Sequence, residues 1–187
     1  MDGVESHAGL DPERGASAVH ALAELVTRIV ALGSPELGTT VNVGVISGGT
    51  GRNVVAGQAR CGIDVRIAVP AEAARIDAAL AALQPSDPRV KVAVTGGWAR
   101  PPMVPDPASG LLFTQAQAIA ADLGWTARDT SVGGASDGNF VAALGRPVLD
   151  GLGAVGDGAH ARHEHVLLDH VPSRTALIAG LLAACAT

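Results

Sequence analysis

The residues best suited to chemistry in this sequence are histidines gathered near its carboxyl end. Four of the six histidines lie at positions 160, 163, 165 and 170. Neutral imidazoles and carboxylates are the ligands of a hydrolytic zinc ion, which keeps one position open for water. The spacing His160-x-x-His163-x-His165 could supply two or three nitrogen ligands, although it differs from the helical HExxH pattern. The residues alone leave two interpretations open, a zinc site and a solvated polar loop.

A glycine-rich segment at 133–139 precedes the histidines and offers a different chemistry. Ser136 has one glycine two residues before it and another two residues after it, which is the spacing of the G-x-S-x-G nucleophile elbow. Asp150 or Asp157, followed by His160, could complete a catalytic triad. A serine at the start of a helix is also a common cap for backbone N–H groups. A serine hydrolase and a capped helix are both compatible with this segment.

Single polar residues elsewhere also allow two interpretations each. Arg100 stands before two prolines, where its guanidinium could clamp a carboxylate or lie in solvent. Arg66 lies on the polar face of an alternating strand and could pair with Asp64. His7 and Asn53 adjoin glycine-containing turns and are ordinary turn residues by themselves. A function cannot be assigned from any one of them alone.

The composition excludes several classes of protein. The formal net charge is −5 and no basic run occurs, which argues against nucleic-acid binding. The two cysteines lie far apart, at 61 and 185, so a disulfide framework is not expected. No signal peptide opens the sequence, and no apolar run reaches membrane-spanning length. We expect a cytoplasmic protein with neither a membrane nor a nucleic acid as its partner.

The first part of the sequence predicts strands and helices in a recognisable order. Alternating apolar residues mark the strands, and apolar residues three or four positions apart mark the helices. The expected elements are a strand remnant at 3–9, a helix at 11–33, strands at 39–46 and 59–67, a helix at 70–85 and a strand at 90–94. This β-α-β-β-α-β order is that of the α+β ferredoxin-like fold.

Prolines between 98 and 105 predict a linker to a second region. The elements expected there are a helix at 107–123, a strand at 126–131, a helix at 136–144, a strand at 147–150 and a helix at 172–186. Two strands are too few to form the sheet of a free-standing α/β domain. We therefore interpret the region as the carboxyl-terminal portion of a larger α/β domain.

Six motifs in a fixed order make the chain resemble a known family. They are Ser6–Gly9 with Pro12 and Gly15, Asn42–Asn53 with its paired glycines, Asp64–Arg66, Arg100–Pro102, Gly133–Asp137, and Gly151–Val166. In this order they resemble the co-catalytic zinc peptidases of the glutamate carboxypeptidase, succinyl-diaminopimelate desuccinylase and aminoacylase family. The glutamate carboxypeptidase-like branch is the most similar, and the resemblance covers essentially the whole chain.

The resemblance implies two domains, a cofactor and a homodimer. Residues 1–100 correspond to the family's lid, a four-stranded dimerisation domain whose first strand is truncated here. Residues 101–187 correspond to the C-terminal part of the α/β zinc-peptidase catalytic domain. Zinc is the implied cofactor, because the family's complete site holds two zinc ions.

The resemblance also assigns roles to individual residues. His160 corresponds to the last zinc ligand, which leaves His163 and His165 outside the ligand set. His7 corresponds to the lid histidine that enters the partner subunit's site and stabilises the oxyanion of the tetrahedral intermediate. Substrate-positioning roles fall to five residues, which are Asn53, Arg66, Arg100, Gly134 and Ser136.

Departures from the family pattern are as informative as the matches. The family's His-x-Asp motif and Glu-Glu pair are absent from this sequence, so at most one zinc ligand remains. We therefore expect an incomplete, inactive fragment of a metal-dependent hydrolase that cleaves an amide next to a free carboxylate, in a small peptide or an N-acyl amino acid. The alternative is a non-catalytic dimerisation module derived from such an enzyme.

Overall fold

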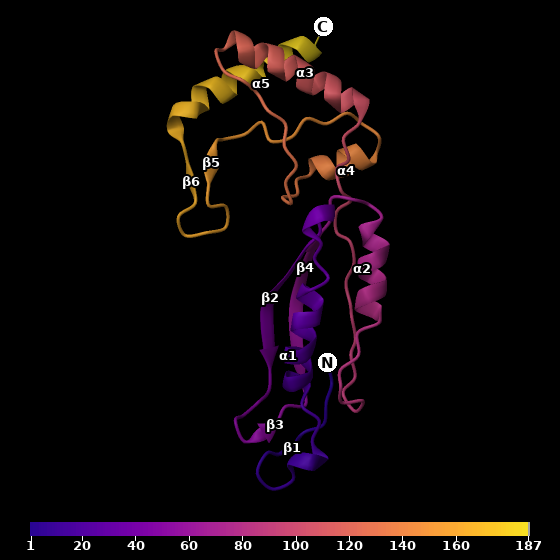
Figure 1. The fold of residues 1–187 in the computed structure, drawn as a ribbon. Coiled ribbons are helices and arrows are strands. Elements are labelled where there is room, and N and C mark those ends of the chain that lie inside the picture. Colours follow the sequence, from indigo (N-terminus) through magenta and orange to yellow (C-terminus); the bar gives the residue numbers. More distant parts are fainter. Residues whose placement is uncertain (187) are drawn as a thin grey trace. The chain divides into compact units, whose positions relative to one another are not determined.

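The computed structural model describes residues 1–186 of the chain. The chain divides into two compact units (Figure 1), a first unit from Met1 to Pro102 and a second unit from Met103 onward. Each unit has its own hydrophobic clusters, and each is described by itself. Their equivalence to a lid and to part of a catalytic domain stays a prediction.

The first unit is built on an antiparallel strand pair. Strand β2 (Thr40–Gly48) runs beside β4 (Ala59–Arg66), with Val41 opposite Val65 and a register shift between Val43 and Val45. Apolar side chains alternate with polar ones along β4, which leaves one face for the core. Both strands were predicted within two residues of their observed starts.

Helix α1 (Ala18–Val30) covers the β2–β4 pair with its apolar face. Ser17 caps the helix by accepting a hydrogen bond from the N–H of His20. Leu25 and Ile29 are buried and pack with strand residues such as Ile63. The predicted start at residue 11 is wrong: Pro12–Arg14 forms a separate 3-10 turn, η1, and Gly15 after it is extended.

The amino-terminal residues lie between two other segments of the first unit. The backbone of Asp2 forms isolated bridges with Gln58 on one side and with Lys91 on the other. Strand β1 (Ser6–His7) then pairs with β3 (Val54–Val55) in a second small sheet. The predicted strand at 90–94 is wrong, because among the described residues only Lys91 of this segment has a bridging partner.

Helix α2 (Glu72–Ala81) is tied to the residue that precedes β2. Glu72 is buried and accepts a hydrogen bond of 2.7 Å from the hydroxyl of Thr39. Arg75, one turn further along the helix, donates to the same carboxylate and to the carbonyl of Leu32. The buried charge of Glu72 is therefore paired as well as hydrogen-bonded.

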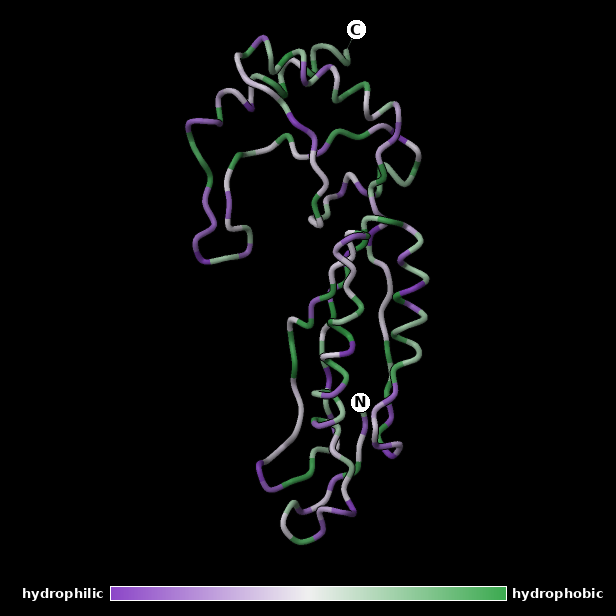
Figure 2. Tube along the Cα trace, in the orientation of Figure 1, coloured by the Kyte–Doolittle hydropathy of each residue, from purple (hydrophilic) through white to green (hydrophobic). Residues whose placement is uncertain are grey.

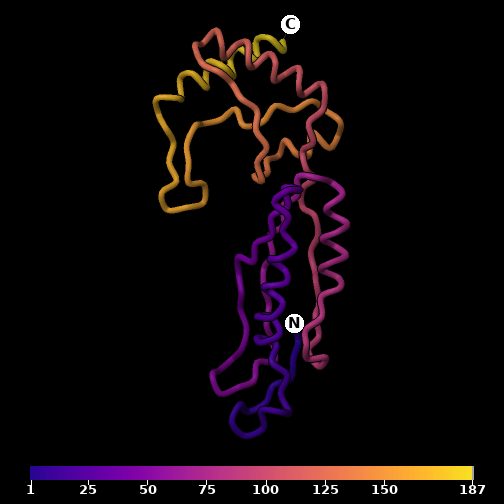
Figure 3. The backbone as a smooth tube through the Cα atoms, in the orientation of Figure 1, coloured from indigo at the N-terminus to yellow at the C-terminus, as the bar shows by residue number. Residues whose placement is uncertain are grey.

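The second unit is a helix pair with a long irregular path between its helices (Figure 3). Helix α3 (Pro107–Asp122) packs against α5 (Val171–Cys185) through Ala116, Leu177 and Leu181. Much of α5 is hydrophobic in Figure 2, although Leu177 and Leu181 are its buried residues. Between them lie the short helix α4 (Gly138–Ala143), the hairpin β5 (Gly156–Asp157) and β6 (His165–Val166), and the 3-10 turn η3 (Leu168–His170).

The two strands predicted in the second unit are absent from residues 103–186. Segments 126–131 and 147–150 have no strand ladder, and an extended segment is a strand only when another strand is hydrogen-bonded to it. The predicted helices of this unit are present as α3, α4 and α5, with ends within two residues of those expected. No helix in the described part of the chain is both long and apolar enough to cross a membrane.

Candidate functional site

His7 is the last residue of β1 and begins a tight turn. Its carbonyl accepts hydrogen bonds from the N–H groups of Leu10 and Asp11. Its ring Nδ1 accepts from the N–H of Gly9 and from the N–H of Leu10, both at 3.1 Å. Because Nδ1 is an acceptor in both bonds, the neutral imidazole carries its proton on Nε2. The exposed side chain therefore offers one N–H donor to a group outside the turn.

Asn53 is brought next to this turn by the pairing of β1 with β3. His7 lies opposite Val54 in the ladder. The N–H of Ala8 donates to the carbonyl oxygen of Asn53 at 2.9 Å. Both predicted site residues are exposed at the same end of the first unit. The structure thus places a histidine donor and an amide side chain within one turn–strand arrangement.

The two predicted arginines of the first unit have different surroundings. Arg66, at the end of β4, forms an ion pair with Asp64 in which Nη2 lies 2.9 Å from the carboxylate. This hydrogen-bonded carboxylate raises the pKa of the Arg66 guanidinium above its ordinary value. Arg100 is exposed in the segment after Trp98, whose indole N–H donates to Asp77 of α2 at 3.1 Å. The substrate-positioning roles of both arginines stay predictions.

Ser136 is held by local hydrogen bonds at the start of α4. Its hydroxyl oxygen accepts from the N–H of Gly138 at 3.0 Å, and its own N–H donates to Oδ1 of Asn139 at 2.9 Å. The first of these bonds satisfies the N–H of the first residue of α4, although the residue in the cap position itself is Asp137, whose side chain makes no cap bond. No histidine is bonded to the hydroxyl in the described residues, so the structure favours the capping interpretation over the nucleophile. Gly134, two residues before it, is exposed.

His160 stands in the loop that joins β5 to β6. It has a φ of 66° and is the one non-glycine residue with a positive φ among residues 1–186. Its N–H donates to Glu164 at 3.4 Å. A left-handed conformation at a non-glycine residue is uncommon and is found often at functional sites. Among the clustered histidines at 160, 163, 165 and 170, His160 alone has a left-handed backbone.

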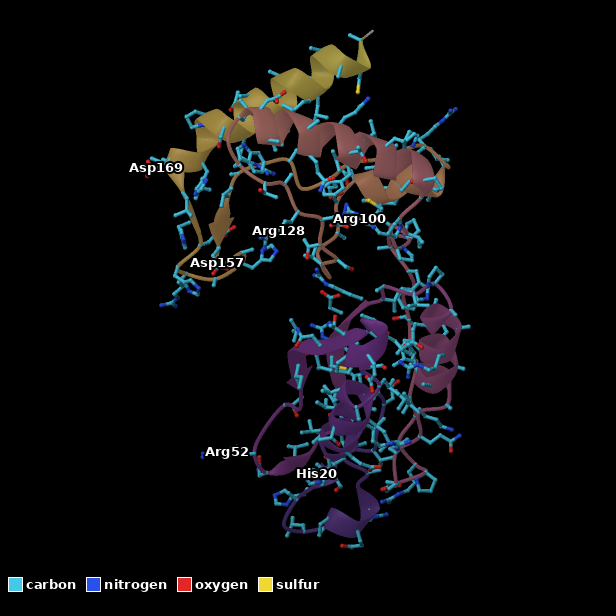
Figure 4. The ribbon with its side chains drawn as sticks, turned by 45° about the horizontal axis from the view of Figure 1, so that its top comes forward. His20, Arg52, Arg100, Arg128, Asp157 and Asp169 are labelled. Atoms are coloured by element: carbon cyan, nitrogen blue, oxygen red, sulfur yellow. The ribbon has the colours of Figure 1, made fainter. Side chains whose placement is uncertain are left out.

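The other hairpin histidines are occupied by local contacts. His163 packs its ring against Gly158, where an added Cβ would lie 2.7 Å from the imidazole. The Nδ1 atom of His165 lies 3.0 Å from the carbonyl oxygen of His163. Asp157, labelled in Figure 4, lies in the same hairpin and accepts from the N–H of Gly158. These contacts shape the loop without assembling a ligand set.

A complete metal site is missing from the part of the chain that the structure describes. No group of three or more histidine, cysteine, aspartate or glutamate side chains there could hold a metal ion. A hollow of about 330 Å³ beside the hairpin is lined by Asp157, Glu164 and His165, among other residues. These donors do not fit a two-zinc centre, and the role of His160 as a zinc ligand stays a prediction.

The predicted residues fall into two sets. His7, Asn53, Arg66 and Arg100 belong to the first unit, whereas Gly134, Ser136 and His160 belong to the second. Arg174 of α5 was not predicted, although it contacts the backbone of Gly151 and Gly153 at the base of the hairpin. The sequence signal that could have found it is a basic residue in the first turn of a helix, where cations are disfavoured.

Comparisons with known proteins find a domain-family match within the first unit. Residues 1–88 match the peptidase dimerisation domain of the M20 peptidases. Carboxypeptidase G2 of Pseudomonas sp. (strain RS-16) is 29% identical over 191 residues, which cover 97% of this chain and 45% of that protein. The chain therefore spans about half the length of this curated relative.

Solved structures share the fold across both units. The aminopeptidase PepT of Bacillus cereus matches with a TM-score of 0.66 at 22% identity, over 100% of this chain and 50% of its own. An amidase of the hydantoinase/carbamoylase family from Burkholderia phymatum matches with a TM-score of 0.65 at 24% identity, over 99% and 46%. At these identities the likeness concerns the mixed α+β fold and not the activity.

Proposed function

Because residues 1–88 match a peptidase dimerisation domain and 97% of the chain aligns with carboxypeptidase G2, we propose that the chain is part of a metal-dependent hydrolase. The observation that carries this proposal is the alignment of 97% of the chain with carboxypeptidase G2. The reaction class is hydrolysis of an amide next to a free carboxylate. The substrate is a small peptide or an N-acyl amino acid, and the protein acts in the cytoplasm.

His7 is the oxyanion donor in this proposal. Its Nδ1 accepts hydrogen bonds from two backbone N–H groups, which leaves Nε2–H as the donor of the neutral ring. A donor held in place in this way stabilises a developing negative charge without reorganising during the reaction. Asn53 lies beside it and supplies an amide for the same substrate region. The lid of one subunit would bring both groups to the site of its partner.

Arg100 and the Gly134–Ser136 segment hold the substrate. The guanidinium of Arg100 suits a free carboxylate, because two parallel N–H donors match its two oxygens. Arg66 is a weaker candidate for the same task, since Asp64 already pairs with it. His160 would bind one of two zinc ions, which supply an activated water and polarise the scissile carbonyl when they are bound.

The first unit is proposed to be a ferredoxin-like βαββαβ lid of residues 1–100 with a truncated first strand. Isolated bridges from Asp2 to Gln58 and to Lys91 put the amino-terminal residues between the segment at Lys91 and the β4 side of the β2–β4 pair, which supports the strand order of that fold. This order leaves β2 as an edge strand with exposed Val45 and Ile46. Such an edge invites pairing with another chain, so we place the homodimer contact there.

A non-catalytic dimerisation module is the second candidate function. It is favoured by one observation, the lack of a metal-binding group in the described residues. Such a module would form the same homodimer through β2 and would bind neither zinc nor substrate. The two candidates therefore predict the same homodimer, but only the hydrolase binds zinc and substrate.

Complementation distinguishes the two candidates. The purified 187-residue chain is mixed with the amino-terminal part of carboxypeptidase G2, and zinc-dependent hydrolysis of an N-acyl amino acid is measured. The hydrolase proposal expects activity only in the mixture, and expects His160→Ala to abolish it while His163→Ala does not. Dimers without zinc binding or activity in any mixture would favour the non-catalytic module.

A further inference from the structure

The first turn of α5 contains an arginine at an electrostatically unfavourable position. Arg174 is the fourth residue of α5, and this turn has no acidic residue to compensate it. The amino end of a helix carries partial positive charge, which disfavours a cation there. Contacts outside the helix must therefore stabilise the side chain.

Those contacts are made with one short stretch of backbone and one aromatic ring. Nε of Arg174 donates to the carbonyl of Gly153 at 2.9 Å, and Nη2 donates to the carbonyl of Gly151. The guanidinium carbon lies 5.6 Å from the ring centroid of Trp125. A planar guanidinium can address two acceptors through its edge while its face covers an indole. A lysine lacks this geometry.

Residues 151–153, here called the stalk, lead directly into the β5–β6 hairpin. Gly151 has a φ of 73°, which residues with a Cβ rarely adopt. Leu152 packs against the α3–α5 cluster, so the middle of the stalk is anchored by its side chain. The carbonyls on either side of Leu152 are the ones that Arg174 binds. Leu152 therefore holds the stalk against the α3–α5 cluster, and the guanidinium of Arg174 fixes the direction of the two flanking carbonyl groups.

The orientation of the stalk determines where the hairpin projects. The N–H of Leu167 donates to Val155 at 2.8 Å, and Gly156 then pairs with Val166. His160 follows within the same hairpin, in its left-handed conformation. A change in the stalk would therefore move the short β5–β6 ladder, and with it the loop that joins the two strands and carries His160.

We propose that Arg174 is a positioning residue, whose two bonds to the stalk orient the hairpin that carries His160. The inference rests on the proposed function, in which His160 is a zinc ligand. Arg174 itself touches neither metal nor substrate. Its role is to hold the ligand-bearing loop against α5 before any metal binds.

The test uses Arg174→Ala and Arg174→Lys in the full chain, with Arg146→Ala as the control. Amide hydrogen exchange is followed in residues 155–167. Each lost hydrogen bond is expected to raise local opening about tenfold. Both Arg174 variants should exchange faster in the hairpin while buried helix amides such as Leu177 keep their rate. Arg146→Ala should match the wild type.

A second measurement separates this inference from the proposed function. Zinc is titrated against each variant, and the imidazole signals of His160 are followed by NMR. Weaker zinc response in both Arg174 variants, with helix protection unchanged, would support positioning of a ligand. If the Arg174 variants exchange faster in the hairpin but the wild type shows no zinc response, Arg174 still positions the hairpin. That result would count only against the role of His160 as a zinc ligand.

Unchanged hairpin exchange in Arg174→Ala would overturn the inference. If that variant unfolds the second unit, Arg174→Lys decides, because it keeps the positive charge and most of the aliphatic stem. If Arg174→Lys keeps the wild-type protection of the hairpin amides, a positive charge and an aliphatic stem are enough to hold the hairpin. The contact of the guanidinium with two carbonyl groups would then have no positioning role.

Discussion

The hydroxyl of Thr39 donates a 2.7 Å hydrogen bond to the carboxylate of Glu72, joining the start of β2 to the start of α2. Only 2% of Thr39 and 5% of Glu72 are exposed. Arg75 pairs with the same carboxylate from the next turn of α2. The first unit therefore contains a buried charge that must stay ionised to keep its partners.

This arrangement predicts a loss of stability in acid. Hydrogen bonds from Arg75 and Thr39 lower the pKa of Glu72 from 4.5 to about 2. The folded-state value is depressed, so the stabilisation is fully present above the unfolded pKa and is lost as the pH falls toward 2. Thermal unfolding of the wild type and of Glu72→Gln between pH 7 and pH 2 checks this. The difference between them should shrink as the pH falls, and a constant difference would contradict the assignment.

The tautomer of His7 is a second prediction. Two backbone N–H groups donate to Nδ1, so the neutral ring should carry its proton on Nε2. Nitrogen-15 NMR of labelled imidazoles above neutral pH distinguishes the two tautomers directly. His20, on the exposed side of α1, is the matched control and should show no such fixed preference. A proton found on Nδ1 of His7 would remove the basis for its role as a donor.

Ser136→Ala tests the capping role of this hydroxyl. Loss of the bond from the N–H of Gly138 should cost about 1 kcal/mol of stability in the second unit. Ser131→Ala removes an exposed hydroxyl outside any helix and should be close to neutral. Denaturant unfolding of the two variants gives the comparison. A new or lost esterase activity in Ser136→Ala would instead revive the serine nucleophile.

The edge of β2 is the predicted dimer contact. Val45 is 68% exposed on this strand, and a lysine there should disfavour pairing with another chain. Sedimentation of the wild type should give a dimer, and Val45→Lys should shift it toward the monomer. Val19→Lys on α1, where the side chain is 37% exposed, should leave the dimer intact. Equal dissociation by both variants would place the contact elsewhere.

Local patterns in the sequence predicted that each helix and the main strand pair exist, although the start of α1 was predicted seven residues too early. The apolar periodicity of α1 and the alternation along β4 depend only on which face meets the core. The extended segments at 90–94, 126–131 and 147–150 have similar local patterns, yet none forms a strand in the described chain. An extended segment becomes a strand only when a second strand forms hydrogen bonds with it, and the sequence of the segment does not reveal that partner.

The site was only partly predictable for the same reason. The adjacency of His7 and Asn53 arises from the pairing of β1 with β3, which brings together residues far apart in the sequence. The acceptors of Arg174 are backbone carbonyls 21 and 23 residues away, so its own sequence context could not reveal them. Side-chain chemistry is visible in a sequence, whereas the backbone groups that orient it appear only in the fold.

Zinc binding by the isolated chain tests the central claim most directly. The claim is that these residues provide the dimerisation lid and the substrate side of a metal-dependent hydrolase, with His160 as their one zinc ligand. Calorimetric titration of the purified 187 residues with zinc, followed by an assay on an N-acyl amino acid, should give weak binding and no hydrolysis. Tight binding of two zinc ions, with zinc-dependent hydrolysis by the chain alone, would contradict it.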